Sequence, residues 1–321
     1  MRLLILAILL AAVGWSAYWF VGANALESTL REAIDDARAD GVEVEVASLD
    51  VTGFPNRFDT IIEEPRIRTA SGIEWSAPFL QVFALSYRPN QLIAALPNEQ
   101  TVAGPFGTAE ITTESARASM TLTTALALDH ANLVVDDLRI ASDDLTLAVA
   151  RVLAATRVPE DAEDGRVQNI GLTLDEVALP PAFADQLGVA GVVDGATLDA
   201  TVTLAEPIDR GTFEGEAIEL RQIDISRLDI DWGEVGLDAS GALSVGADGV
   251  LTGEISVAFR NWSRAVDIAV AAGLLPPNQA EQVRLGLRFV AGDGDRLELP
   301  LSFRDGLVYL GPFPLGDAPR L

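Results

Sequence analysis

The sequence predicts a mainly β protein, with one N-terminal transmembrane helix, an elongated antiparallel β domain and a few short helices near the C-terminus. Residues 3–21 are apolar and uncharged, most of the chain after residue 42 alternates apolar and polar side chains, and two helical patterns interrupt this alternation after residue 260. Because so little helix is available to cover the sheets, their apolar faces must meet or curve, as a sandwich, a curved sheet or a half-open barrel.

Residues 1–22 are the predicted transmembrane anchor. The uncharged run from Leu3 to Val21 would extend roughly 28 Å as a helix, which is close to the thickness of bilayer hydrocarbon. Arg2 precedes this run, whereas the remaining chain is strongly acidic. The bias of basic residues toward the cytoplasmic side therefore predicts a cytoplasmic N-terminus and a main domain outside the cytoplasm.

A secretory signal is the alternative interpretation of this stretch, because residues 23–25 (Ala-Asn-Ala) fit the small-x-small pattern of a cleavage site. We expect a retained anchor, since the apolar run is longer than the usual core of a signal. Aromatic side chains also crowd the outer end of the run, where amphipathic rings suit the headgroup level. They are Trp15, Tyr18, Trp19 and Phe20.

Residues 23–41 predict a short amphipathic helix, because Leu26, Leu30 and Ile34 recur at helical spacing and Gly41 supplies a stop. Residues 42–321 form the predicted β-rich domain. Within it, the polar segment 157–169 is the expected junction between two halves, since it is the most polar stretch of the chain.

Hairpin signals and short helices complete the predicted organisation of the β-rich domain. Asp248-Gly249 and Asp305-Gly306 each separate two runs of alternating residues, as expected of tight β-turns. Helices are predicted over residues 262–272 and 278–290, and residues 180–187 are expected to make one or two helical turns.

The charge and the residue inventory exclude several classes of function. The net charge is −26, from 48 acidic and 22 basic residues, and all of the bases are arginine. Such a surface repels phosphate backbones, so we expect no binding of nucleic acid. His130 is the only histidine and cysteine is absent, which leaves too few groups for a Ser-His-Asp triad, a zinc site or a disulfide framework. We therefore expect no enzymatic activity, cofactor or metal.

Three blocks carry a resemblance to a known family: residues 53–59 (GFPNRFD), residues 75–78 (WSAP) and the ending from residue 303 to residue 312. With the N-terminal membrane segment, they resemble the Gram-negative envelope proteins grouped as domain-of-unknown-function family 2125, over nearly the whole chain. This resemblance implies a single-pass inner-membrane protein with a periplasmic main domain, and it implies no particular activity. The residues expected to form a structural signature are Gly53, Phe54, Pro55, Arg57, Asp59, Trp75, Pro78, Asp305 and Gly306.

The hairpin pattern of residues 241–255 is more loosely similar to hairpins of AsmA-like envelope proteins, a resemblance that implies a role in lipid transport or outer-membrane assembly. Combined with the surplus of apolar sheet face, it leads to the hypothesis that the β domain offers an apolar groove to lipid. The alternative is a structural or scaffolding module that binds other envelope proteins. The inner membrane, lipid and envelope proteins are thus the expected partners.

Overall fold

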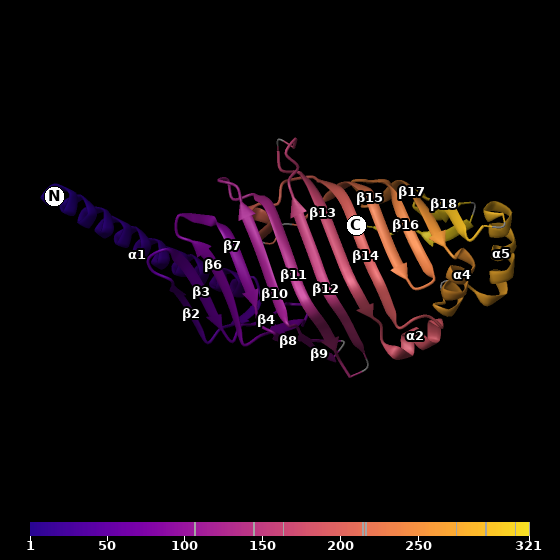
Figure 1. The fold of residues 1–321 in the computed structure, drawn as a ribbon, viewed down its shortest axis with the longest axis horizontal. Helices are drawn as coiled ribbons and strands as arrows, with labels where there is room; N and C mark the ends of the chain where they lie inside the picture. Colours follow the sequence, from indigo (N-terminus) through magenta and orange to yellow (C-terminus); the bar gives the residue numbers. More distant parts are fainter. Residues whose placement is uncertain are drawn as a thin grey trace. The chain divides into compact units, whose positions relative to one another are not determined.

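The structure is a computed structural model that describes residues 1–105, 107–143, 145–162, 164–213, 215, 217–273, 275–292, 294–311 and 313–320. Figure 1 shows a long N-terminal helix followed by antiparallel strands and a few short helices, which confirms the predicted fold class. The chain divides into two compact units. Unit 1 comprises residues 1–124 and 139–145, and unit 2 comprises residues 125–138 and 146–321.

The boundary between the two units does not fall at residues 157–169, where the sequence pattern predicts a junction. This segment joins β12 (Thr146–Arg157) to β13 (Val167–Ala178), two strands that pair directly within unit 2. Its described charged residues are exposed, namely Arg157, Glu160, Asp161, Asp164 and Arg166, which accounts for the polar composition of the segment. The division between the units instead falls at residues 124 and 125, with the end of one further hairpin assigned to unit 1.

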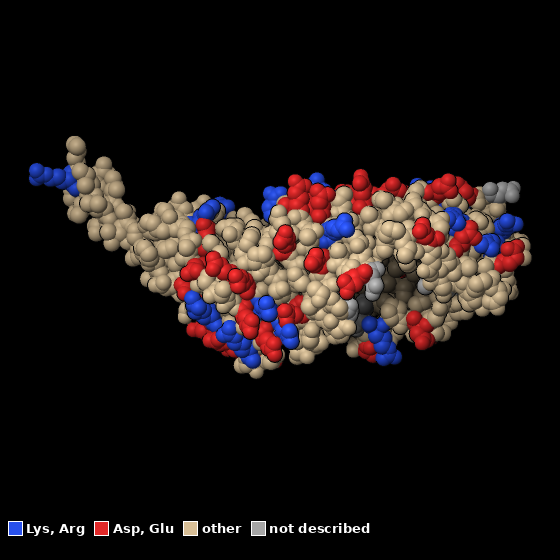
Figure 2. Space-filling view, turned by 90° about the horizontal axis from the view of Figure 1, so that it is seen from below, with Lys and Arg blue, Asp and Glu red and all other residues tan. Residues whose placement is uncertain are grey.

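Helix α1 runs without interruption from Arg2 to Ala39, across both the predicted anchor and the predicted amphipathic helix. No proline lies in this stretch, and alanine and leucine dominate it, so nothing breaks the helical hydrogen bonding before Gly41, whose φ of +87° ends the helix. Among the described residues, α1 is the one helix that is long and apolar enough to cross a membrane. The protruding end of α1 carries no acidic group in Figure 2.

The strands of unit 1 pair in two antiparallel ladders. The first ladder consists, in order of pairing, of β2 (Ser48–Thr52), β3 (Arg57–Glu63), β6 (Phe79–Leu85), β7 (Arg88–Leu96) and β10 (Ser115–Leu122). The second consists of β1 (Glu43–Glu45), β4 (Arg66–Arg68), β5 (Glu74–Ser76), β8 (Glu99–Gly104), β9 (Gly107–Thr112) and the last residues of β11 (Leu128–Ala141).

Prolines mark the points where the chain passes between the two ladders. Pro65 lies between β3 and β4, Pro78 between β5 and β6, and Pro97 between β7 and β8. Each proline lacks the N–H that would continue a ladder, so the strand bends there. The corner is closed by the amide of Glu64, which donates to the carbonyl of Pro78 at 2.9 Å. Pro78 of the predicted signature is therefore a corner residue.

An ion cluster joins β1, β4 and β5 at one end of the second ladder. Arg68 donates to the carboxylate of Glu74 through Nε at 3.0 Å and through Nη2, and its Nε lies 3.7 Å from Glu43. Arg66 Nε lies 3.7 Å from the other oxygen of Glu74. The hydrogen bond from Arg68 lowers the pKa of Glu74 from its ordinary value of 4.5. The cluster thus stabilises the ionised form of Glu74.

This lowered pKa predicts a pH dependence of stability. A carboxyl whose folded-state pKa is depressed stabilises the fold above its unfolded-state pKa, and the contribution disappears as the pH falls through the lower folded-state value. Replacing Glu74 with Gln should therefore flatten the decrease in the urea unfolding midpoint between about pH 6 and pH 3. Glu99→Gln, at an exposed acid on β8, should retain the wild-type slope. Equal slopes for wild type and Glu74→Gln would contradict the prediction.

Unit 2 begins with most of β11, and its later strands follow one another in an antiparallel meander from β12 to β20. After β12 and β13 come β14 (Val192–Leu204), β15 (Leu220–Trp232), β16 (Val235–Val245), β17 (Leu251–Arg260), β18 (Arg296–Arg304), β19 (Leu307–Leu310) and β20 (Phe313–Asp317). The helices of this unit are α2 (Pro181–Leu187), α3 (Arg210–Phe213), α4 (Trp262–Ala271) and α5 (Pro277–Ala291).

The helices and hairpins predicted for this region are present. Helices α2, α4 and α5 lie where the sequence patterns place them. Asp305 and Gly306 join β18 to β19 with φ values of +55° and +73°, the positive values that a tight type I′ hairpin turn needs at both central positions. These two residues of the predicted signature therefore form a turn of unit 2. Pro312, at the end of the block used for the resemblance, lies outside the described residues.

The core of unit 2 lies at its C-terminal end. One cluster of buried apolar side chains lies on β16–β18 and includes Leu243, Ile255 and Phe303. A second lies between α4, α5 and β18 and includes Trp262, Leu287 and Leu297. Within unit 2, α4 lies against β16 and α5 lies against β18. The helices therefore cover the C-terminal end of the sheet.

Candidate functional site

Three side chains on one face of α1 donate hydrogen bonds to backbone carbonyls of unit 1. Trp15 Nε1 donates to Pro55 at 2.9 Å, Tyr18 Oη to Ser86 at 2.7 Å and Trp19 Nε1 to Arg57 at 2.7 Å. The spacing of three and four residues places these groups on the same side of the helix. By sequence alone, these residues are interpreted only as aromatic side chains at the level of the lipid headgroups. Their spacing along the helix could have predicted that they share one docking face.

Aromatic packing reinforces these hydrogen bonds. Trp19 is 5% exposed and stacks on Phe58 with ring centroids 5.9 Å apart. Its edge also meets Phe54 at 5.4 Å, and Phe54 stacks on Phe20 at 5.5 Å. Ala23 is buried in the same cluster. The loop between β2 and β3 is therefore fixed to α1 by both apolar contacts and hydrogen bonds.

Gly22 allows α1 to lie close to Phe58, and replacing this glycine tests the packing of α1 on unit 1. A Cβ atom at Gly22 would lie 2.9 Å from Cζ of Phe58, whereas one at Gly14 would meet nothing within 4 Å. Gly22→Leu should therefore destabilise the packing of α1 on unit 1 by about 1–3 kcal/mol, as overpacking does elsewhere. Gly14→Leu is the matched control and should have no such effect. Thermal unfolding in detergent, followed by tryptophan fluorescence, measures the difference, and equal melting temperatures would refute the packing role.

The residues of the predicted signature in this loop hold its shape. Arg57 Nη2 pairs with Asp59 Oδ2 at 2.6 Å, and the amide of Arg57 donates to the carbonyl of Gly53 at 3.0 Å. Gly53 has a φ of +97°, and a Cβ there would lie 3.0 Å from the carboxylate of Asp59. The structure thus brings Gly53, Arg57 and Asp59 together with Phe54 and Pro55 in one structural site beneath α1.

The remaining signature residues lie apart from this site. Trp75, on β5, donates from Nε1 to Oε1 of Gln100 at 3.0 Å. Pro78 and Gln100 both line a hollow of about 480 Å³ in unit 1. Asp305 and Gly306 form the turn in unit 2 described above. The signature therefore consists of separate structural elements, and it does not assemble into one site.

Unit 2 carries an apolar sheet face. In the paired strands, Ala154, Leu172, Leu198 and Leu228 form one row across β12, β13, β14 and β15, because each is the register partner of the next. Neighbouring rows on the same face are also apolar and half-buried. The members of this face, which we call the apolar face, are Val152, Ala154, Ile170, Leu172, Leu174, Ala196, Leu198, Leu228 and Ile230.

One end of the apolar face is closed. Val202 and Leu204 are buried there, and Gln168 is 1% exposed and accepts a hydrogen bond from Thr156 at 2.9 Å. The middle rows remain half-buried, and among the described members of the apolar face Leu228 alone packs against the C-terminal core cluster. Seen from below in Figure 2, the surface of unit 2 is hollowed beside the strands that Figure 1 labels β14 and β15. The sheet therefore presents an apolar surface that is only partly shielded from solvent.

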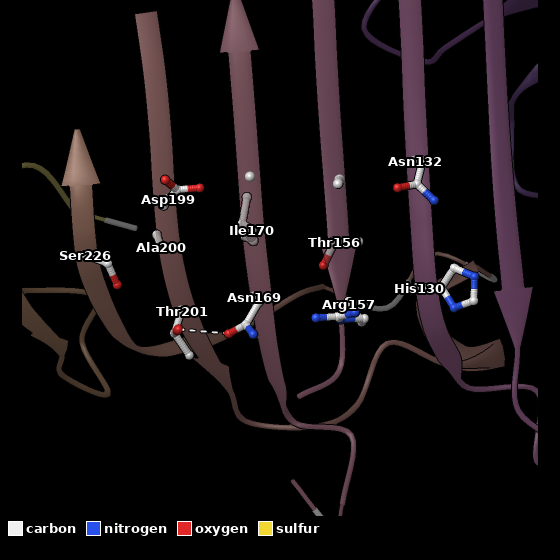
Figure 3. Close-up of a pocket in the computed structure, with 12 residues that line it drawn as sticks. His130, Asn132, Thr156, Arg157, Asn169, Ile170, Asp199, Ala200, Thr201 and Ser226 are labelled. Carbon is white, nitrogen blue, oxygen red and sulfur yellow. Dashed lines mark hydrogen bonds between the residues drawn. The ribbon is translucent and has the colours of Figure 1, made fainter. Parts of the chain in front are cut away.

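The opposite face of the same strands is polar and contains a shallow hollow of about 630 Å³ (Figure 3). Thr201 donates to Asn169 at 2.9 Å, and His130 Nδ1 lies 2.7 Å from a carboxylate oxygen of Asp129. Ser226, on β15, and His130, on β11, lie on opposite sides of this hollow (Figure 3), and β12, β13 and β14 lie between their strands. At 4.8 Å per strand their separation is roughly 19 Å, so Ser226 and His130 cannot form a nucleophile–base pair.

The described residues supply little else for catalysis. No group of three or more His, Cys, Asp or Glu side chains is placed to hold a metal ion among them. The charged side chains of the polar face are mostly exposed, as expected of a solvated surface. The features that distinguish this molecule are therefore the docking of α1 and the partly exposed apolar face.

Comparison with known proteins identifies one family. A family model described as "Uncharacterized protein conserved in bacteria (DUF2125)" matches residues 19–319. The match begins at Trp19 and includes all nine residues of the predicted signature. The chain matches no curated protein.

Proposed function

Since the chain belongs to this bacterial family, DUF2125, over nearly its whole length, we propose that it is a single-pass inner-membrane protein that binds lipid on the apolar face of unit 2. Both units would lie in the periplasm, and the protein would catalyse no reaction. The observation that carries this proposal is the set of half-buried apolar rows on β12–β15. An N-terminal helix followed by β-rich units fits membrane anchoring.

The apolar face is large enough to cover part of an acyl chain. From Ile170 to Leu174 it extends roughly 13 Å along β13, and it crosses the four strands β12–β15, which is roughly 14 Å. Each methylene group moved from water onto the face would contribute roughly 0.8 kcal/mol. The lining is alanine, valine, leucine and isoleucine, so it offers contact area without a fixed hydrogen-bonding pattern. Such a surface favours lipid tails over a polar ligand.

Charge supports the proposed location and partners. Arg2 is the only charged side chain before Glu27, and the chain as a whole carries a net charge of −26. The positive charge of Arg2, directly before the apolar run, supports a cytoplasmic N-terminus. The acidic surface also disfavours binding of nucleic acid.

Lipid analysis of the full-length chain tests the proposed binding. The protein is extracted from membranes in a mild detergent, analysed by native mass spectrometry and then extracted with solvent to identify lipid. About one phospholipid per chain is expected, because the half-buried rows of the apolar face have room for a single lipid. A chain that carries no lipid under conditions in which it remains folded would refute lipid binding.

The absence of cysteine makes the proposed topology directly testable. Phe289, on α5, is 91% exposed, so a Phe289→Cys variant offers one reactive thiol. A membrane-impermeant maleimide should label this thiol in cells whose outer membrane alone is permeabilised. Labelling that requires disruption of the inner membrane would place unit 2 in the cytoplasm and refute the topology.

An exposed apolar stripe on α5 favours a second function, the binding of other envelope proteins. Leu285 is 59% exposed, Phe289 is 91% exposed and Val290 is 54% exposed. Leu285 and Phe289 lie on the same side of the helix at a spacing of four, and Val290 lies about 100° further round the helix. Crosslinking from this stripe should capture a reproducible protein partner if the chain is a scaffold, and Phe289→Ser should abolish that capture.

A further inference from the structure

The free part of α1 is too short to span a membrane by itself. Contact with unit 1 begins at Trp15, whose indole donates to the carbonyl of Pro55 at 2.9 Å. From Arg2 to Trp15 the helix extends roughly 20 Å, whereas the bilayer hydrocarbon is about 30 Å thick. The remaining 10 Å or so of apolar helix, to Val21, is already docked on unit 1. A spanning α1 therefore brings the docked residues of unit 1 to the level of the membrane.

The part of unit 1 placed at this level is apolar on its surface. Phe54, in the β2–β3 loop, is 50% exposed although it stacks on Phe20 of α1. Tyr87, in the turn between β6 and β7, is 59% exposed and follows Ser86, whose carbonyl accepts the hydrogen bond from Tyr18. The two turns are also joined directly, because the amide of Ser86 donates to the carbonyl of Asn56 at 2.9 Å. Two exposed aromatic side chains thus lie on adjoining turns beside the membrane helix.

The charge of this region differs from that of the rest of the chain. Although the protein contains 48 acidic residues, none occurs in residues 1–26, 53–58 or 79–98. Asp59, which follows the first turn, is 7% exposed and paired with Arg57. The exposed charged groups on the two turns are therefore Arg57 and Arg88. Aromatic rings beside arginines, without exposed acids, are typical of a surface that meets anionic headgroups.

We propose that these two turns form a membrane seat, in which Phe54 and Tyr87 enter the interfacial layer of the leaflet on the side of the β units. Arg57 and Arg88 would lie at the level of the lipid phosphates. The partner of this surface is the phospholipid bilayer that α1 spans. The inference rests on anchoring by α1, which is part of the proposed function, and it is independent of lipid binding on the apolar face. It fixes the height of unit 1 above the membrane.

Spin labels at single cysteines test the seat in the full-length chain, reconstituted in vesicles of phosphatidylethanolamine and phosphatidylglycerol. The variants Phe54→Cys and Tyr87→Cys report on the seat, and both replace exposed side chains. Ile73→Cys is the matched control, because Ile73 is an exposed apolar residue in a turn of the second ladder. That ladder meets α1 near Arg38, roughly 35 Å along the helix from Trp15. Leu10→Cys, in the exposed part of α1, gives the internal depth reference.

The ratio of collisions with oxygen to collisions with a water-soluble nickel complex increases with depth. We expect this ratio to be several-fold higher at residues 54 and 87 than at residue 73, and highest at residue 10. The proposed membrane seat would be overturned if residues 54 and 87 gave the same ratio as residue 73 while the label at residue 10 was deep in the bilayer. That result would still support anchoring by α1. A label at residue 10 that is fully accessible to the nickel complex would overturn the anchor and the seat together.

Discussion

Replacing Leu198 with glutamate should reduce the lipid that co-purifies with the full-length chain by about tenfold or more, which corresponds to at least 1.4 kcal/mol of binding free energy. Leu198 lies in the central row of the apolar face, between Leu172 and Leu228. A carboxylate there would have to lose its hydration when an acyl chain covers it, or it would have to keep water in the groove. Either effect weakens binding of an apolar chain.

The adjacent residue provides the matched control. Thr197 precedes Leu198 on β14, so its side chain points to the polar face of the same sheet. Thr197→Glu adds the same charge at nearly the same position along β14, but on the polar face, and should leave the lipid content unchanged. Solvent extraction and native mass spectrometry of both variants, purified in parallel, give the comparison.

A second variant separates lost binding from lost folding. Leu198→Trp keeps the face apolar but fills the space above it, so it should also reduce bound lipid while preserving the thermal unfolding midpoint. Lipid content equal to wild type in both Leu198 variants would rule out the apolar face as the binding surface. Loss of lipid in Thr197→Glu as well would show that added charge, and not the apolar face, controls the lipid content.

Truncating Trp19 to alanine should destabilise the docking of α1 on unit 1 by about 3–5 kcal/mol, the usual range for a buried aromatic residue. Trp19 is 5% exposed, contacts Phe54 and Phe58, and donates a hydrogen bond to the carbonyl of Arg57 at 2.7 Å. The variant removes these contacts and leaves the carbonyl without this donor. Because the β2–β3 loop depends on the same contacts, we expect faster amide exchange in that loop.

Two further variants separate the contribution of packing by Trp19 from that of its hydrogen bond. Trp19→Phe keeps most of the packing and removes the hydrogen bond, so it should cost about 1 kcal/mol. Val21→Ala is the control on the same helix, because Val21 is 69% exposed and should matter little for unfolding in detergent. Unfolding midpoints and hydrogen exchange of the full-length chain measure all three. Equal midpoints for Trp19→Ala and Val21→Ala would contradict the docking function of Trp19.

Local patterns were sufficient to predict the fold class. The alternation along β14 and β16, the Asp-Gly turn at Asp305 and the apolar N-terminal run are determined by neighbouring residues, so they can be read directly from the chain. The family resemblance also rested on contiguous blocks. These signals share one property, which is that each depends on residues close in sequence.

The docking of α1 could not be predicted in this way. Trp15, Tyr18 and Trp19 have the composition expected of rings at a membrane surface, and nothing near them in sequence shows that Pro55, Ser86 and Arg57 accept their hydrogen bonds. The same limit applies to the signature. Its residues were found, but only the fold shows that those of the β2–β3 loop lie beneath α1, whereas Pro78 bends a strand and Asp305 begins a turn.

By itself, the sequence determined that this protein is β-rich, acidic and preceded by a helix able to cross a membrane, because periodicity and charge are properties of short stretches of chain. The tertiary structure alone decided which apolar surfaces are covered. The leucines on β13 and β14 and the leucines on β16 and β18 look alike as sequence, since both alternate with polar residues. They differ because the leucines of β16 and β18 pack into the two buried clusters of unit 2, one that contains no described helix residue and one completed by α4 and α5, whereas Leu172, Leu174 and Leu198 remain half-buried. That difference depends on contacts between residues far apart in the chain.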